Sequence, residues 1–277
     1  MTTFQTVIYA IIHGLSEFTP IPADAQDLLV SRLLHWNLPH TQLEGAFALG
    51  SLIALLIFFR HDWASIFSCF IQVLLFRKKP MSLDERMVFF LALGSAPLFA
   101  AWLYGSPMVR EAQWPTAVVP LSVFAFTIPL ILTESFGKRM KGMFDWNWLD
   151  SLLLGAAQVA TLLPGSGRVA LVLPFAILRH YTGEAAVKYT FYLALPWLSL
   201  RAVKLLQDVS FQAPQSIGDL SWLSFGIAIL VTFVIGLMTL GWMTQRSSLR
   251  GMKRWILYRL LIAGGIGVSL YLQSGYL

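Results

Sequence analysis

The sequence predicts an all-α integral membrane protein with six transmembrane helices and two inverted re-entrant helix–loop–helix hairpins. Two observations carry this prediction: the composition, and the order of apolar segments and basic loops. Of the 277 residues, 57% are hydrophobic and only 12% are charged, and the mean hydropathy is +0.67. Soluble domains average about 25% charged residues, so this chain has too few charges to cover a water-facing surface. The composition argues against a soluble enzyme, a disordered chain and a nucleic-acid-binding module.

Six apolar segments have the length needed to cross a bilayer, which is about 20 residues. They cover roughly residues 42–59, 87–105, 115–133, 189–206, 222–243 and 255–273. Two further apolar segments, at about 5–34 and 151–179, are interrupted by polar residues, Gly and Pro. Broken backbone survives at membrane depth only inside protein or beside a wet cavity. We therefore expect these two segments to form the re-entrant hairpins.

The basic residues favour the same topology, because cytoplasmic loops carry an excess of Lys and Arg. Loops rich in Lys and Arg occur at 60–86, 134–150, 179–188 and 244–254. The opposite set of segments contains only Arg32 and Arg110. This alternation requires each broken segment to begin and end on one side, which places both termini outside. No Lys or Arg precedes Arg32, so we expect the N-terminal segment to belong to the mature fold rather than to a secretory signal.

The two broken segments resemble each other, with a polar residue about two helical turns before a proline in each. His13 precedes Pro20 in the first, and Gln158 precedes Pro164 in the second. By the topology above, one hairpin enters from outside and the other from inside. We therefore expect a single membrane domain over 1–277 that contains inverted repeats at approximately 1–105 and 151–243, with a site where the broken helices meet.

The first break carries ionisable residues that are costly inside an apolar segment and for that reason usually functional. His13 and Glu17 are four residues apart and share one helical face. Glu17 has the chemistry to bind a divalent cation or act as a base, and His13 to transfer protons or bind metal; a solvated interfacial pair is the alternative. Asp24 is a metal ligand or, equally, a helix N-cap. Gln26 can only donate and accept hydrogen bonds.

The second break, Pro164 to Arg168, has the features of a phosphate-binding loop. Gly165 and Gly167 allow positive φ, and Ser166 lies between them. A helix beginning just after the glycines would direct its N–H groups toward an anion. Arg168 adds a planar, permanently charged guanidinium suited to phosphate. The alternative is an ordinary Pro-Gly turn beside an arginine that reaches for the headgroups.

These segments resemble the bacterial undecaprenyl-diphosphatases of the bacitracin-resistance type. The similarity lies in HGLSEFTPIPADAQ (13–26), PGSGRV (164–169) and LGSLIALLIFFR (49–60). The resemblance implies hydrolysis of undecaprenyl diphosphate to the monophosphate, which recycles the lipid carrier for peptidoglycan synthesis. It also implies a divalent cation (Mg²⁺ or Ca²⁺), a polyprenyl diphosphate substrate, and a bacterial inner-membrane location with a site facing the periplasm. A homodimer is left open.

By the same resemblance, Glu17 matches the family's second acidic position and Arg168 its essential arginine. His13 stands at the first acidic position, Gln26 at the family histidine, and Gly167 at a family serine. The catalytic residues predicted from this match are Glu17, His13 and Arg168. The predicted substrate-binding residues are Arg168, Gly165, Ser166, Gly167 and Gln26, and the predicted metal ligands are Glu17 and Asp24.

Because Pro22 and Ala23 replace a serine pair and Val169 another serine, two alternatives to hydrolysis stay open. One is a catalytically impaired homologue that binds or translocates polyprenyl phosphate. The other, suggested by the repeat alone, is a proton-coupled small-solute transporter.

Overall fold

The computed structural model describes residues 1–38, 41–76, 82–105, 114–137, 139–211, 222–245 and 252–274. Within these ranges the chain forms α-helices, two short 3-10 helices and one isolated β-bridge, between Lys141 and Tyr181. Several basic residues that support the predicted topology lie outside the described ranges: Arg77, Lys78, Lys79, Arg110, Lys138, Arg246 and Arg250.

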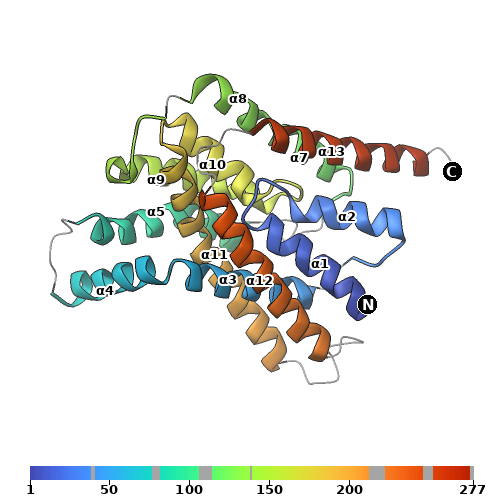
Figure 1. Ribbon diagram of the computed structural model, residues 1–277, viewed down its shortest axis with the longest axis horizontal. Coiled ribbons are helices and arrows are strands. Elements are labelled where there is room, and N and C mark those ends of the chain that lie inside the picture. Colours follow the sequence, from blue (N-terminus) through green and yellow to red (C-terminus); the bar gives the residue numbers. More distant parts are fainter. Residues whose placement is uncertain are drawn as a thin grey trace.

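The helices of the first half are α1 (Thr3–Ser16), α2 (Ala23–Leu34), α3 (Thr41–Phe58), α4 (Arg60–Phe76), α5 (Leu83–Tyr104), α7 (Val118–Ala125) and α8 (Ile128–Phe136). Those of the second half are η1 (Met143–Asp145), α9 (Trp148–Val159), η2 (Ala160–Leu162), α10 (Arg168–Leu178), α11 (Gly183–Phe211), α12 (Trp222–Gln245) and α13 (Met252–Ser274). The start of α1 and the end of α13 lie toward one end of the molecule, and the end of α4 and the start of α5 lie at the other (Figure 1).

The apolar helices identify a membrane protein. Among the described residues, α5, α12 and α13 are each long and apolar enough to cross a bilayer. The pair α3 and α4 also passes this test when taken together, but the two helices bend by 85° at their junction. The all-α membrane class predicted from the sequence is therefore confirmed, while the six-span arrangement stays a prediction.

Both predicted helix breaks are present. α1 ends at Ser16 and α2 begins at Ala23, and α2 folds back against α1. α9 continues into η2, and α10 begins at Arg168 after a five-residue loop, 163–167. The prolines Pro20, Pro22 and Pro164 lie within these breaks, where they remove backbone donors and disfavour helix in the preceding residue.

The two halves of the chain use matching helix contacts. α1 packs on α12, and α9 packs on α5; α2 packs on α13, and α10 packs on α8. α3 and α11 lie against each other between the halves. α10 lies in the interior, because its side chains from Val169 to Ile177 are buried except for Phe175, which is 37% exposed. A helix that is hydrophobic all round belongs in the interior.

Two predicted segment boundaries are wrong. The segment 60–86, expected to be a loop, contains the helix α4, whose Trp63 is buried against Tyr192 and donates its indole N–H to the carbonyl of Leu55. The apolar segment 115–133 contains two short helices, α7 and α8, instead of one continuous helix. Pro129 explains this break, because a proline ring clashes with the carbonyl four residues earlier, here Ala125, the last residue of α7.

A buried carboxylate closes the second hairpin at the ends of its two helices. Asp150 at the start of α9 is fully buried and accepts hydrogen bonds from Arg179 Nε (2.5 Å) and the Tyr181 hydroxyl (2.7 Å). Lys141 Nζ lies 3.7 Å away. Burial acts to raise the pKa of Asp150, but the hydrogen bonds from Tyr181 and Arg179 outweigh it and hold that pKa below its ordinary value.

Asp150→Asn should lower the free energy of unfolding by roughly 1–3 kcal/mol, because it removes the charged acceptor of these bonds. Thermal unfolding in detergent at pH 7 measures this, with the exposed Asp145→Asn as the control. Since the folded-state pKa of Asp150 is depressed, its contribution is lost as the pH falls through that pKa, and the difference between variant and parent should shrink there. Equal effects of the two substitutions at pH 7 would contradict the assignment.

Candidate functional site

The two broken segments meet in an ion pair. Arg168 Nη1 donates to Glu17 Oε1 at 2.8 Å, across 151 positions of sequence. The side chains are only 7% and 15% exposed, so the charges lie inside the protein. Arg168 is the first residue of α10, and Glu17 is the C-cap of α1. The two breaks therefore meet, as expected from the sequence, and they do so by direct side-chain contact.

The loop before Arg168 has the geometry expected of an anion-binding turn. Gly165 and Gly167 have φ of 78° and 74°, the left-handed region that suits glycine. Gly167 is the N-cap of α10 and gives no side-chain cap, so the first N–H groups of the helix have no capping oxygen. Arg168 Nε is buried and has no hydrogen-bond partner within the described ranges. Free donors and a guanidinium are thus gathered at one helix N-terminus.

Ser166 has a role in holding this loop. Its side chain is buried, and its hydroxyl donates to the carbonyl of Leu163 at 2.7 Å. The bond closes the turn that presents Gly165 and Gly167. The predicted substrate contact through the Ser166 hydroxyl stays a prediction, since that hydroxyl already donates its proton within the loop.

Asp24 also reaches the second loop from the first. Its Oδ2 accepts the N–H of Gly165 at 3.3 Å. α2 begins at Ala23 with Pro22 as its N-cap, so the alternative interpretation of Asp24 as the N-cap is wrong. Asp24 instead lies in the first turn of α2, where a carboxylate is favoured by the helix dipole.

The donor set for a metal is small. No cluster of three or more His, Cys, Asp or Glu side chains suited to a metal is found among the described residues. Glu17 and Asp24 both contact the loop 163–168, through Arg168 and Gly165. Mg²⁺ is commonly held by one or two carboxylates together with substrate phosphates, and this pair fits that mode. It does not fit a site built from protein ligands alone.

His13 does not pair with Glu17. Its Nε2 lies 2.8 Å from Oδ2 of Asp27, on α2, and both side chains are buried. The sequence prediction placed His13 one helical turn from Glu17, which holds, but it did not anticipate Asp27. Asp27 lies on the buried face of α2, where an unpaired charge would be costly. That position was the sequence signal that Asp27 needs a buried partner such as His13.

Gln26 and Arg259 hold the breaks to the last helix. Gln26 accepts the Ser16 hydroxyl at 2.8 Å and donates to the hydroxyl of Tyr258 on α13. Arg259 is fully buried and donates to the carbonyls of Pro20 (3.1 Å) and Gly165 (3.5 Å), one from each break. Arg259 was not predicted as a site residue; its place within an apolar segment was the signal that could have found it.

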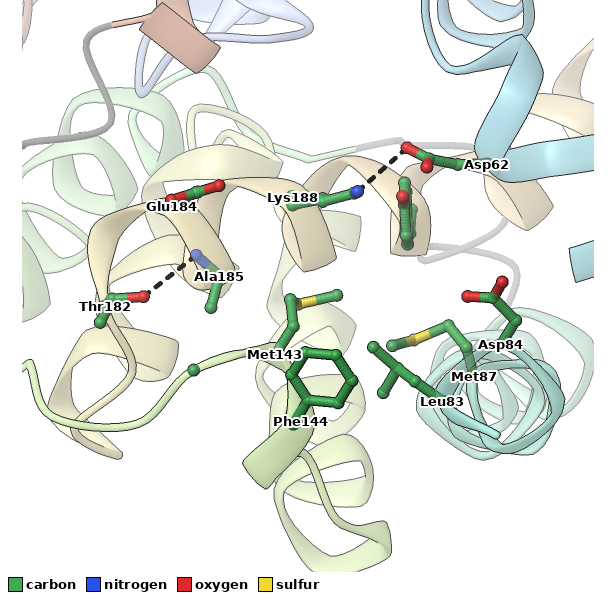
Figure 2. A pocket seen from close by; sticks show the side chains of 12 residues that line it. Asp62, Leu83, Asp84, Met87, Met143, Phe144, Thr182, Glu184, Ala185 and Lys188 are labelled. Carbon is green, nitrogen blue, oxygen red and sulfur yellow. Dashed lines mark hydrogen bonds and ion pairs between the residues drawn. The ribbon is translucent and has the colours of Figure 1, made fainter. Parts of the chain in front are cut away.

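A cavity of about 380 Å³ lies away from this site, where α5 and α11 begin. Figure 2 shows Lys188 directed at Asp62, with which it forms an ion pair of 3.1 Å. Asp84 and Glu184 also line the cavity. Three carboxylates against one lysine give a lining that repels a diphosphate. This cavity therefore lacks the anion-binding features that the joined breaks have, the uncapped N–H groups of α10 and Arg168.

A family model described as "Bacitracin resistance protein BacA" matches residues 6–265. The chain belongs to this family. The match runs from α1 into α13, so it includes both breaks, the Glu17–Arg168 pair and Arg259. Membership is thus carried by the whole arrangement and not by one motif.

Curated relatives align along nearly their whole lengths. The undecaprenyl-diphosphatase of Chlorobaculum tepidum is 28% identical over 287 residues, which cover 100% of this chain and 99% of the relative. Undecaprenyl-diphosphatase 1 of Pseudoalteromonas translucida is 24% identical, over 98% of this chain and 99% of the relative. The undecaprenyl-diphosphatase of Myxococcus xanthus is 25% identical, over 100% and 91%.

Gly165→Ala should destabilise the protein and Gly226→Ala should not. At Gly165 a Cβ would lie 2.7 Å from the carbonyl oxygen of Val119, and the φ of 78° adds a strain of about 1–2 kcal/mol. At Gly226, inside α12, a Cβ meets nothing within 4 Å, and alanine should stabilise the helix by about 0.5–1 kcal/mol. Thermal unfolding in one detergent compares the two. A Gly165→Ala variant as stable as the parent would show that the loop relaxes freely.

Proposed function

We propose that this protein hydrolyses undecaprenyl diphosphate to undecaprenyl phosphate in the bacterial inner membrane, and so recycles the lipid carrier for cell-wall synthesis. The observation that carries the proposal is the buried Glu17–Arg168 pair at the meeting point of two helix breaks. Its chemistry suits a phosphate anhydride, and relatives aligned over the same length bear the name undecaprenyl-diphosphatase.

The diphosphate binds at the start of α10 in this proposal. Arg168 offers a planar fork that matches phosphate oxygens, and its unpartnered Nε is available to a ligand. The uncapped N–H groups of α10 add donors at the positive end of the helix dipole. Catalysis of phosphoryl transfer is mostly positioning and electrostatic stabilisation. Backbone N–H donors and the Arg168 guanidinium are therefore sufficient to bind and stabilise the diphosphate, even though Gly167 and Val169 carry no hydroxyl.

Glu17 activates water for attack on the terminal phosphorus by accepting one of its protons. The bond between that phosphorus and the bridging oxygen breaks, inorganic phosphate leaves, and the bridging oxygen stays on the lipid monophosphate. Arg168 moves from Glu17 to the phosphate oxygens when the substrate binds, which frees the carboxylate for this role. His13, one turn earlier on α1, supplies the proton for the departing oxygen.

A divalent cation would suit the mixed protein–phosphate mode described above, with substrate oxygens completing the protein ligands. When bound, Mg²⁺ or Ca²⁺ neutralises developing charge on the phosphate oxygens. Glu17 and Asp24 are the residues that would hold it.

For the topology we infer six spans, two re-entrant hairpins, both termini outside, and a site open to the periplasm. The start of α1 and the end of α13 lie toward one end of the molecule (Figure 1), as this arrangement requires. The matching contacts, α1 with α12 and α9 with α5, support inverted repeats at approximately 1–105 and 151–243.

Single cysteines at Thr3 and Ser274, in a Cys69→Ala background, should both react with an impermeant maleimide applied to intact cells or right-side-out vesicles. The reason is that each re-entrant hairpin returns to the side it entered, so the count of crossings is even. Reaction at only one of the two positions would overturn the six-span topology. A cysteine at Glu184, expected inside, serves as the control that should stay unlabelled.

Purified protein should release phosphate from farnesyl or undecaprenyl diphosphate, faster with Mg²⁺ than with EDTA. Arg168→Ala should lower turnover by roughly 10²–10³-fold and weaken substrate binding, because it removes charge that stabilises the transition state. Glu17→Ala should lower turnover by roughly 10²–10⁴-fold. Arg254→Ala, at the exposed start of α13, is the control. A parent protein that binds polyprenyl phosphate without any hydrolysis would replace the proposal with a binding or translocating function.

A further inference from the structure

A second buried pair lies beside the Glu17–Arg168 pair, and it links the two arms of the first hairpin. His13 on α1 and Asp27 on α2 contact through Nε2 and Oδ2 at 2.8 Å. Both side chains are about nine-tenths buried, with exposed fractions of 10% and 8%. The N–H of Glu17 bonds to the carbonyl of His13 at 3.0 Å, so the imidazole lies one turn from the proposed catalytic carboxylate.

The His13 ring is fixed in two directions. Phe47 of α3 stacks on its face, with ring centroids 4.4 Å apart and an interplanar angle of 27°. Asp27 holds its edge. An ionised carboxylate only accepts hydrogen bonds, so Nε2 carries the hydrogen that points to Asp27, and Nδ1 is left for proton exchange. A ring fixed in plane and in tautomer is the arrangement that a proton-transfer histidine requires.

Charged groups from each neighbouring helix surround the pair. Glu44 of α3 and Arg201 of α11 interact electrostatically with His13, and they lie 3.8 Å from each other in a partly exposed ion pair. Their charges largely cancel. Asp27, which contacts the ring directly, is therefore the carboxylate that compensates a protonated imidazole.

Asp27 also has an oxygen that nothing in the described chain satisfies. Its Oδ1 is buried and without a hydrogen-bond partner. A buried unpaired polar atom is costly, and a packed apolar pair would hold α1 against α2 at least as well as this ion pair. Stability therefore does not account for a carboxylate at this place.

We propose that Asp27 is a positioning residue that holds His13 for proton transfer in diphosphate hydrolysis. This inference rests on the proposed function. Protonated His13 gives the proton on Nδ1 to the bridging oxygen as the bond to the terminal phosphorus breaks. Water supplies the hydroxyl that joins that phosphorus, and Glu17 takes the proton that water loses. Transfer of one proton from Glu17 back to His13 restores the starting state, so each cycle consumes one water and releases one phosphate.

A double-mutant cycle on the full-length protein in detergent tests this, with phosphate release from farnesyl diphosphate as the assay. His13→Ala should lower kcat by roughly 10²–10⁴-fold. Asp27→Asn should lower kcat by roughly 10-fold to 10²-fold, the effect of a misplaced catalytic group, and change KM by less than about threefold. The combined variant should be no slower than His13→Ala, because Asp27 acts only through His13. Asp27→Glu, which keeps the carboxylate, should recover part of the loss.

Asp62→Asn is the matched control, since it makes the same change in an ion-paired carboxylate at the cavity between α5 and α11, away from the site, and should leave kcat within about twofold. Thermal unfolding and the active fraction of each variant separate a folding defect from a catalytic one. Full kcat in folded Asp27→Asn, or a combined variant slowed by the product of the single effects, would overturn the positioning role while leaving the hydrolase assignment intact. A parent protein without hydrolysis would overturn both.

Discussion

The ion pair between Glu17 and Arg168 constrains how the helices around it can be arranged. Opposite charges within apolar surroundings must pair, because either one alone would be far more costly than the two together. Pairing them requires two helices to stop at the same place, one ending at Glu17 and the other beginning at Arg168. The other arm of each broken segment is α2 in the first and α9 in the second.

Residues outside the Glu17–Arg168 ion pair hold the two helix breaks against each other. Arg259 reaches both breaks through the carbonyls of Pro20 and Gly165. In a trans peptide the carbonyl and the next N–H point in opposite directions, so bonds to these carbonyls also set the direction of the neighbouring N–H groups. Asp24 adds a further link between the breaks through the N–H of Gly165. Contacts within the protein therefore fix the geometry of the site without any bound lipid headgroup.

Periodic and compositional features of the sequence were sufficient for the membrane class, the all-helical content and the two breaks. Proline and glycine clusters predict a helix break wherever they interrupt an apolar segment, and both such clusters coincide with breaks. The failures have local causes. Basic residues at both ends of 60–86 suggested a loop, yet the apolar run between them forms α4. Pro129 separates α7 from α8. The sequence shows this proline, but the prediction of one continuous helix was based on the length of the apolar segment.

Within the site, the residues found from sequence were those with unusual local chemistry: Glu17, Arg168 and the two positive-φ glycines. What sequence could not provide was the partner of each. Asp27 lies 14 positions from His13, and Arg259 lies 94 from Gly165, so only the packed helices bring them together. Helical spacing placed Glu17 one turn from His13, so the sequence interpretation paired these two residues and missed Asp27 on α2.

The position of Arg259 has a consequence for biosynthesis. Membrane chains leave the ribosome from the N-terminus, and Arg259 is 239 positions after Pro20, on α13. Until α13 has been inserted, the two breaks lack the bonds from Arg259, although the Glu17–Arg168 pair and the Asp24–Gly165 bond also link them. A chain in which α13 is not yet inserted therefore lacks the Arg259 bonds to both breaks, and the full set of contacts around the breaks forms only after this helix is in place.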